Sequence, residues 1–196
     1  MNLGDFIRET SNGLNHVSIY DRLVQERKIF FTEEVNSKSA NELIASLMAL
    51  EIENSAEPIT LFINSPGGEV DSGLAVYDVI TRLKVPVDTV CIGTAASMAS
   101  IIFLAGRNRC MYEHTKIMIH DPLLSGLSGV KKALELEKEA KRLMEVRDIL
   151  GRIIAQRTGR TLKEVLSKTK EDCFLTAEEA LKFGIATDIF YNDRKN

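Results

Sequence analysis

Apolar and polar positions along the first half of the chain follow two different periods, which predict strands and helices in turn. Runs rich in β-branched and aromatic residues predict buried strands at 28–32, 59–64 and 87–92. Helical spacing predicts helices from about 39 to 53, at 71–83 and at 97–105, the first opened by a capping box that begins at Ser39. Strands that alternate with helices favour an α/β fold with a largely parallel sheet.

A long amphipathic helix is predicted beyond this alternating region and beyond two short strands near 109–112 and 116–120. Apolar residues recur every three or four positions from Val130 to Arg157. The front half of this segment is dense in Lys and Glu, which indicates that the helix extends past a small core. An exposed helix supported by i,i+4 pairs, such as Glu137 with Lys141, is the simpler interpretation.

Both ends of the chain give further signals. Capping boxes at Thr161 and Thr176 predict two helix starts, with Asp172 on the short link between these helices. Residues 1–17 are polar and rich in Asn without periodicity, so we expect them to be mobile. A chain of 196 residues suits one domain, which we place at 18–196.

Composition narrows the classes of protein to consider. The net charge of −3 and the pI near 5.7 give no reason to expect nucleic-acid or membrane binding. The three cysteines, Cys91, Cys110 and Cys173, are too far apart for a zinc site or a disulfide framework, which favours a reducing compartment. The first residues lack the basic and apolar regions of a signal peptide, and no run approaches membrane-spanning length. We therefore expect a cytoplasmic protein without a metal or cofactor.

Ser97 is the first candidate for chemistry. It follows the apolar run 87–92, within a stretch from Gly93 onward whose small residues predict a tightly packed helix. A hydroxyl at such a junction lies near free N–H groups and the positive end of the helix dipole. By itself, such a serine is more often a simple N-cap.

Three other stretches supply complementary groups. Pro66, Gly67 and Gly68 follow a strand and form either an ordinary turn or a source of bare N–H donors for an oxyanion. His120 ends a predicted strand, where a buried histidine with a structural role is the commoner case. Asp172 stands in a charged run, where an aspartate is normally only solvated.

Together, four motifs in this order resemble the ClpP family, the proteolytic subunits of Clp proteases. The motifs are Ser-Pro-Gly-Gly at 65–68, Gly-x-x-Ala-Ser-Met-Ala at 93–99, Met-Ile-His-x-Pro at 118–122, and Asp-x-Phe-Leu-Thr-Ala at 172–177. The resemblance runs from about residue 18 to 189. It implies a crotonase-like α/β fold of repeated strand–helix units, with a protruding handle at about 122–157 that contains the long helix.

The resemblance implies a serine endopeptidase with a catalytic triad. Ser97 would be the nucleophile, His120 the general base and Asp172 the residue that orients the imidazole. The N–H groups of Gly68 and Met98 would form the oxyanion hole. The chemistry is sound, because a serine hydroxyl needs a base within hydrogen-bond reach, and a carboxylate on the other ring nitrogen fixes the tautomer.

The resemblance also implies an assembly of two stacked heptameric rings that encloses the active sites. Short peptides and unfolded proteins would be cleaved inside this barrel, and the peptidase step itself would need no ATP. Larger proteins would need an AAA+ Clp unfoldase as a partner, because the sequence has no Gly-x-x-x-x-Gly-Lys-(Ser/Thr) phosphate loop of its own. The segment 1–17 would surround the axial pore.

Two sets of contact residues follow from the same resemblance. The unfoldase would dock in an apolar pocket between subunits, for which this chain offers Phe62, Val90, Ile92 and Tyr112. Thr60 and Arg82 make that pocket more polar than is common in the family. Lys170 and Glu171 would bridge the two rings, in an order of charges opposite to that of most relatives.

Two rival functions stay open from the sequence. An acyl-CoA hydratase or isomerase on the same fold would use the backbone donors near Gly68, but would leave Ser97, His120 and Asp172 unexplained. A conditionally active subunit in a barrel shared with a second ClpP isoform is the other. The better-known serine hydrolase families match poorly, because the order of the three residues differs from theirs and Ser97 lies in no Gly-x-Ser-x-Gly elbow.

Overall fold

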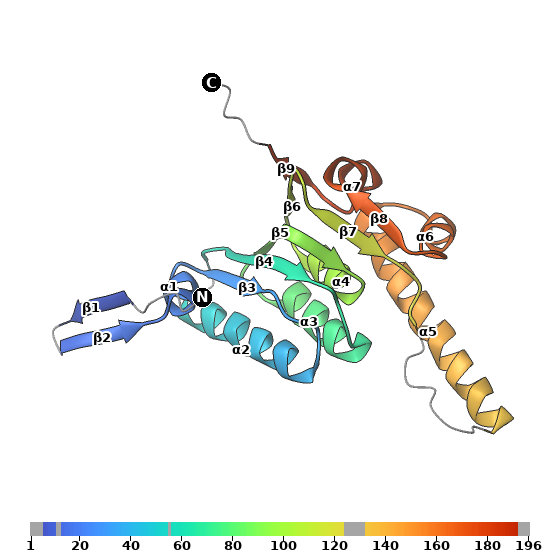
Figure 1. Ribbon diagram of the computed structural model, residues 1–196, viewed down its shortest axis with the longest axis horizontal. Coiled ribbons are helices and arrows are strands. Elements are labelled where there is room, and N and C mark those ends of the chain that lie inside the picture. Colours follow the sequence, from blue (N-terminus) through green and yellow to red (C-terminus); the bar gives the residue numbers. More distant parts are fainter. Residues whose placement is uncertain (1–5, 11–12, 55, 124–131, 192–196) are drawn as a thin grey trace.

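The computed structural model of the chain describes residues 6–10, 13–54, 56–123 and 132–191. A sheet of seven strands forms its centre (Figure 1). Five strands pair in parallel in the order β3 (Lys28–Phe31), β4 (Ile59–Ser65), β5 (Val87–Ala96), β6 (Arg109–Tyr112) and β9 (Asp188–Phe190). This arrangement confirms the predicted α/β class with a largely parallel sheet.

Strand β5 is longer than its apolar run predicted. It continues through Gly93 to Ala96 and pairs with a different strand along each half of its length. The first half pairs with β6 and the second half with β7 (Lys116–Ile119). β7 in turn pairs antiparallel with β8 (Cys173–Thr176), a strand that the sequence did not predict. The second half of β5 is therefore the point where the catalytic candidates converge.

Helices α2 (Ser37–Glu53), α3 (Val70–Arg82) and α4 (Met98–Ala105) pack side by side against one face of the sheet (Figure 1). Every residue of α4 is buried, as expected of a helix that is apolar on all sides. The capping box of α2 was predicted three residues too late. Asn36 is the N-cap, and Ser39 is its partner at the third helical position.

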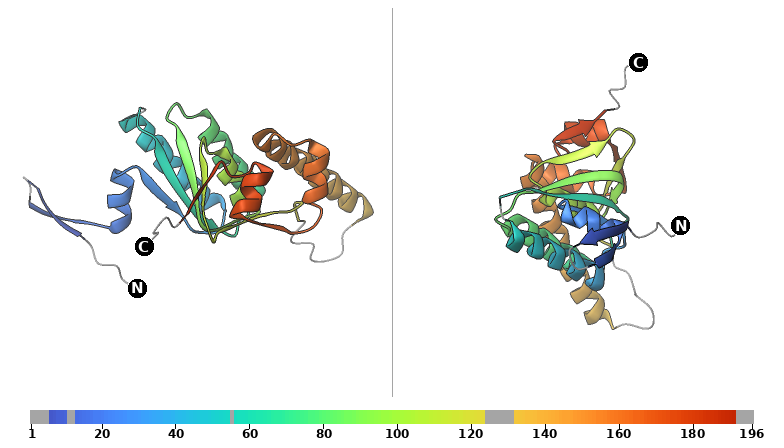
Figure 2. Two further views of the ribbon diagram at one scale, coloured as in Figure 1. Left: turned by 90° about the horizontal axis from the view of Figure 1, so that it is seen from above. Right: turned by 90° about the vertical axis from the view of Figure 1, so that its left-hand side faces the viewer.

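The long helix is present as α5 (Ala133–Thr158), and only Leu150, Gly151 and Ile154 are buried along it. It projects from one end of the molecule, while the hairpin of β1 (Phe6–Thr10) and β2 (Gly13–Val17) projects from the other (Figures 1 and 2). Helix α1 (Ile19–Gln25) leads from this hairpin to β3. The sequence analysis predicted neither element: residues 1–17 carry no apolar periodicity, and α1 is only seven residues long.

Two short helices close the fold, α6 (Leu162–Lys168) and α7 (Ala177–Phe183). Both begin with the predicted capping boxes, Thr161 with Glu164 and Thr176 with Glu179. The hydrogen bonds from Thr161 lower the pKa of the Glu164 carboxyl, and those from Thr176 lower the pKa of Glu179. Both carboxylates therefore stay ionised as partners in their caps at neutral pH.

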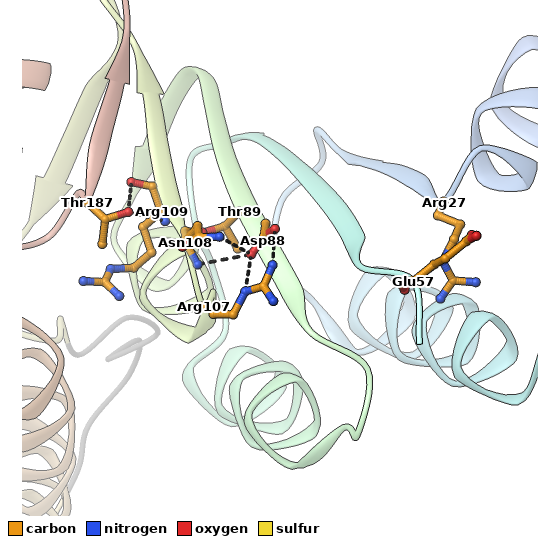
Figure 3. Close-up of polar contacts among 8 residues, drawn as sticks. All are labelled: Arg27, Glu57, Asp88, Thr89, Arg107, Asn108, Arg109 and Thr187. Atoms are coloured by element: carbon orange, nitrogen blue, oxygen red, sulfur yellow. Dashed lines mark hydrogen bonds and ion pairs between the residues drawn. The ribbon is translucent and has the colours of Figure 1, made fainter. Parts of the chain in front are cut away.

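The turn after α4 is held by two polar clusters (Figure 3). Asp88 accepts hydrogen bonds from Arg107 and from the amide of Asn108, and so ties this turn to the start of β5. The buried Arg109 guanidinium donates to the Ile185 carbonyl at 2.7 Å. Burial lowers the pKa of Arg109, and the nearby charge of Arg157 lowers it further. The C-terminal end of α4 is thus fixed, and its N-terminal end follows Ser97.

Candidate active site

Ser97 occupies the junction of β5 and α4 in an unusual conformation. Its φ of 53° and ψ of −124° lie outside the regions that residues with a side chain favour. Such a backbone costs about 1–3 kcal/mol and persists only where neighbours enforce it. Here the Ser97 N–H donates to the Met118 carbonyl at 2.9 Å. Ser97 is the N-cap residue of α4 by position, but its side chain makes no capping hydrogen bond.

The Ser97 hydroxyl instead contacts His120. Ser97 Oγ and His120 Nε2 are 2.8 Å apart. This proximity follows from strand pairing, since β5 and β7 run parallel with Ala96 beside Met118. Ser97 directly follows Ala96, and His120 comes two residues after Met118, so both side chains lie at the C-terminal ends of these two neighbouring strands. The His120 side chain is 12% exposed, which leaves it reachable without full hydration.

Asp172 reaches the other side of the imidazole. In the antiparallel pair of β7 and β8, Ile119 lies opposite Cys173, so the next position along places His120 opposite Asp172. His120 Nδ1 and Asp172 Oδ1 are 3.3 Å apart. This is an ion-pair distance, yet the buried Nδ1 forms no hydrogen bond with any of the residues described, so the two groups are close but not aligned.

A glycine turn packs directly against the turn at Ser97. Gly67 and Gly68 have φ values of 90° and 149°, which favour glycine. A Cβ atom on Gly67 would lie 2.5 Å from the Ala96 carbonyl oxygen and 2.8 Å from Ser97 Cβ. The turn is held from its other side by Val35, whose N–H donates to Gly67 O at 2.7 Å.

Two backbone donors close to Ser97 are free. The N–H groups of Gly68 and Met98 donate to no other residue within the described parts of the chain. Met98 is the first residue of α4, so its N–H has no partner inside the helix. Both residues line a cavity of about 320 Å³ together with Ser97 and His120. Its buried apolar lining comes from Ile101, Ile119, Leu150 and Ile154.

This arrangement brings together the groups that acyl transfer needs. Comparison with known proteins identifies the family of the chain. The sequence model of one protein family, described as Clp protease, matches residues 11–193. The chain belongs to the Clp protease family. It is 42% identical over 171 residues to the ATP-dependent Clp protease proteolytic subunit 3 of Synechococcus sp. (strain CC9902), which covers 86% of this chain and 84% of that protein.

Other members of the Clp protease family are similarly close. The proteolytic subunit 2 of Prochlorococcus marinus (strain NATL2A) is 41% identical over 86% of this chain and 84% of its own length. The proteolytic subunit 2 of the Prochlorococcus strain MIT 9312 is 42% identical over 86% of this chain and 83% of its own. The family and fold implied by the resemblance are therefore confirmed.

The four docking residues that the resemblance to the Clp family implied do not line one cavity in the single chain. Ile92 and Tyr112 line one cavity of about 450 Å³, together with Phe190 and Tyr191, which the sequence interpretation missed. Phe62 lies elsewhere, with its ring stacked on Phe30 at 4.7 Å between centroids. Val90 is buried in the isolated chain. The only signal in the sequence for Phe190 and Tyr191 is that two aromatic residues stand side by side there.

The remaining polar candidates of this Clp protease chain lie outside the cavity. Lys170 and Glu171 are exposed and form no ion pair with any residue that the structure describes.

Nowhere in the described ranges do three His, Cys, Asp or Glu residues gather as metal ligands would. Cys91 and Cys110 are free thiols, and burial raises the pKa of each. Among the same residues, no helix combines the length and hydropathy needed to cross a bilayer.

Proposed function

We propose that this chain is a serine endopeptidase subunit of a Clp-type protease, with Ser97 as nucleophile, His120 as general base and Asp172 as the group that orients the base. The observation that carries the proposal is the contact of 2.8 Å between Ser97 Oγ and His120 Nε2. A serine hydroxyl within hydrogen-bond reach of a neutral imidazole is the arrangement that makes it nucleophilic.

The reaction follows from these positions. Ser97 Oγ attacks the peptide carbonyl carbon while its proton moves to His120 Nε2. The carbonyl oxygen gains negative charge, which the free N–H groups of Gly68 and Met98 are available to stabilise. His120 then donates the proton to the departing amine, leaving an acyl-enzyme at Ser97. A water molecule, deprotonated by the same nitrogen, completes hydrolysis and regenerates the hydroxyl.

The working form that we propose is an oligomer partnered by an ATPase. Relatives are named as subunits of ATP-dependent proteases, while this sequence has no phosphate-binding loop of its own. Two stacked heptameric rings with an AAA+ unfoldase on the axial face would supply both enclosure and unfolding. The exposed front half of α5 would be the handle between rings, and residues 1–17 would border the axial pore. Three free thiols fit a reducing compartment such as the cytoplasm.

One observation favours a subunit that is active only in the assembled state. Asp172 lies 3.3 Å from His120 Nδ1 without a hydrogen bond, and its side chain is 66% exposed in the single chain. Contact with a neighbouring subunit, of this chain or of a second isoform, would align the carboxylate. An acyl-CoA enzyme on the same fold is not favoured, because it gives no role to the contact between Ser97 and His120.

Replacing the nucleophile tests the proposed function. We expect Ser97→Ala to assemble normally, to lose labelling by a fluorophosphonate probe, and to lose about 10⁶ in turnover of a fluorogenic peptide. Ser167→Ala is the matched control, because Ser167 is an exposed serine on α6 away from the cavity. Peptidase activity that persists in a Ser97→Ala preparation free of other proteases would exclude Ser97 as nucleophile, and turnover of an acyl-CoA without probe labelling would support the rival enzyme class.

A further inference from the structure

Asp121 directly follows His120 along the chain, yet its carboxylate serves a different set of contacts. Asp121 Oδ2 accepts a hydrogen bond from Arg147 Nε at 2.6 Å, and Oδ1 accepts one from Thr169 Oγ1 at 2.7 Å. The Asp121 N–H also donates to the Thr169 carbonyl at 2.7 Å. Both oxygens of one carboxylate are therefore engaged, each by a donor from a different part of the chain.

These contacts join three segments that are distant in sequence. Asp121 extends β7, Arg147 lies on α5, and Thr169 is the C-terminal cap of α6. Thr169 is 3% exposed, and the side chains of Asp121 and Arg147 are 30% and 22% exposed. An ion pair that is mostly shielded from water and carries further hydrogen bonds holds its geometry better than an exposed pair.

The same contacts determine where the catalytic candidates lie. Asp121 is covalently joined to His120, and only two residues separate Thr169 from Asp172. The Asp172 carboxylate has no hydrogen bond to any residue that the structure describes, apart from its approach to His120. Its position therefore depends on the backbone on each side of it, which is β8 on one side and Thr169 on the other.

We propose that Asp121, Arg147 and Thr169 form a brace that sets the spacing between His120 and Asp172 and couples it to helix α5. These three are positioning residues for the peptidase reaction, so the inference rests on the proposed function. Loss of the brace lets the segment 169–172 drift from β7. The imidazole then loses the carboxylate that holds its proton-bearing nitrogen in place, while the substrate cavity keeps its shape.

Thr169 offers a sharp pair of variants. Thr169→Val keeps the volume of this buried side chain and removes only the donor to Asp121, whereas Thr169→Ser keeps the hydroxyl. We expect Thr169→Val to lower kcat by about tenfold to a hundredfold with KM unchanged, the loss that a displacement on the order of 1 Å of a catalytic group causes. Thr169→Ser should restore at least half of wild-type kcat.

Arg147 has a matched control on the same helix. Arg147→Gln should lower kcat as Thr169→Val does, whereas Arg152→Gln should not, because Arg152 makes only an exposed pair with Asp148 at 3.9 Å. All variants are made in the full chain and compared in the assembled protein. The rate at which the fluorophosphonate labels Ser97 should fall in the same order, independently of any peptide substrate.

A double-mutant cycle separates positioning from a merely structural role. If the brace acts through Asp172, Thr169→Val should add less than a further twofold loss in an Asp172→Asn background. Additive losses that follow the melting temperature, or a folded Thr169→Val enzyme with wild-type kcat and labelling rate, would overturn the brace. Failure of the proposed function looks different, because the wild-type enzyme would then show no turnover or labelling that depends on Ser97.

Discussion

Gly67 is the residue whose replacement tests the geometry of the proposed active site most directly. A Cβ added to Gly67 meets three atoms of the Ser97 turn at under 3.0 Å, and two of them are backbone atoms that no rotamer change can move. The nearest, the Ala96 carbonyl oxygen, would be 2.5 Å away, about 0.9 Å short of the 3.4 Å at which ordinary contact begins. Either the glycine turn or the Ser97 turn must shift in Gly67→Ala.

The expected effect has two components. A left-handed φ costs a residue with a side chain about 1–2 kcal/mol, and this applies to Gly67 at 90°. The shift of one turn against the other also separates the Gly68 donor from the Met98 donor. Loss of one oxyanion donor costs about 10²–10³ in turnover. We therefore expect Gly67→Ala to lose at least about a hundredfold in kcat.

Gly159 supplies the matched control. It ends α5 with a φ of 71°, and a Cβ there would meet nothing within 4 Å. Gly159→Ala should pay only the backbone cost, which lowers the melting temperature by about 2–4 °C per 1 kcal/mol in a domain of this size, with turnover unchanged. The assays are thermal unfolding by circular dichroism and steady-state hydrolysis of a fluorogenic peptide by the assembled protein.

The comparison between these two variants decides the outcome. A Gly67→Ala enzyme that keeps kcat within twofold of wild type would show that the two turns do not hold the oxyanion donors in register. Equal losses of turnover in Gly67→Ala and Gly159→Ala would mean that global destabilisation, rather than local geometry, explains the effect. Probe labelling of Ser97 in the same samples reports whether the nucleophile is still activated.

Three further predictions concern assembly, access and the thiols. Glu171→Arg should give single rings with weak peptidase activity, and adding Lys170→Glu should restore both; double rings at full activity in the single variant, by native mass spectrometry, would contradict a bridge here. Deleting residues 2–12 should speed degradation of an unfolded protein more than hydrolysis of a short peptide, and equal rates before and after deletion would argue against a gate. Iodoacetamide at pH 7 should modify the partly buried Cys173 before Cys91, which is fully buried with a pKa raised by burial and should react only when the chain unfolds; early labelling of Cys91 would refute this.

Most of the regular elements follow from local patterns. Short apolar runs predict the strands β3, β4 and the first half of β5. The Thr-x-x-Glu spacing predicts the helix caps at Thr161 and Thr176. β8 and β9 were not predicted, because β8 directly follows the charged run 170–172 that was interpreted as a link between helices, and β9 has only three residues. Their strand geometry comes from partners, β7 for one and β6 for the other.

The cap of α2 shows how local signals mislead by a few residues. Both Asn36 and Ser39 are residues favoured at helix starts, and Ser39 with Glu42 satisfies the capping-box spacing. In the structure, Ser39 donates to the Glu34 carbonyl at 2.7 Å, which fixes the chain upstream and allows the helix to begin earlier. The choice between the two caps rests on that contact, which the sequence pattern does not contain.

The sequence by itself determined the α/β class, the family and the identity of the candidate catalytic residues, because these depend on local periodicity and on motifs of adjacent residues. It left open how Ser97, His120 and Asp172 come together. The tertiary structure decided this through the pairing of β5 with β7 and of β7 with β8, which converts separations of 23 and 52 residues along the chain into contacts of 2.8 and 3.3 Å. It also decided what the carboxylate of Asp121 binds, because its partners Arg147 and Thr169 lie 26 and 48 residues further along the chain. Strand geometry alone indicates that neighbouring side chains point to opposite sides and so directs Asp121 away from the imidazole, whereas only the packing of α5 and α6 shows that Arg147 and Thr169 bind it.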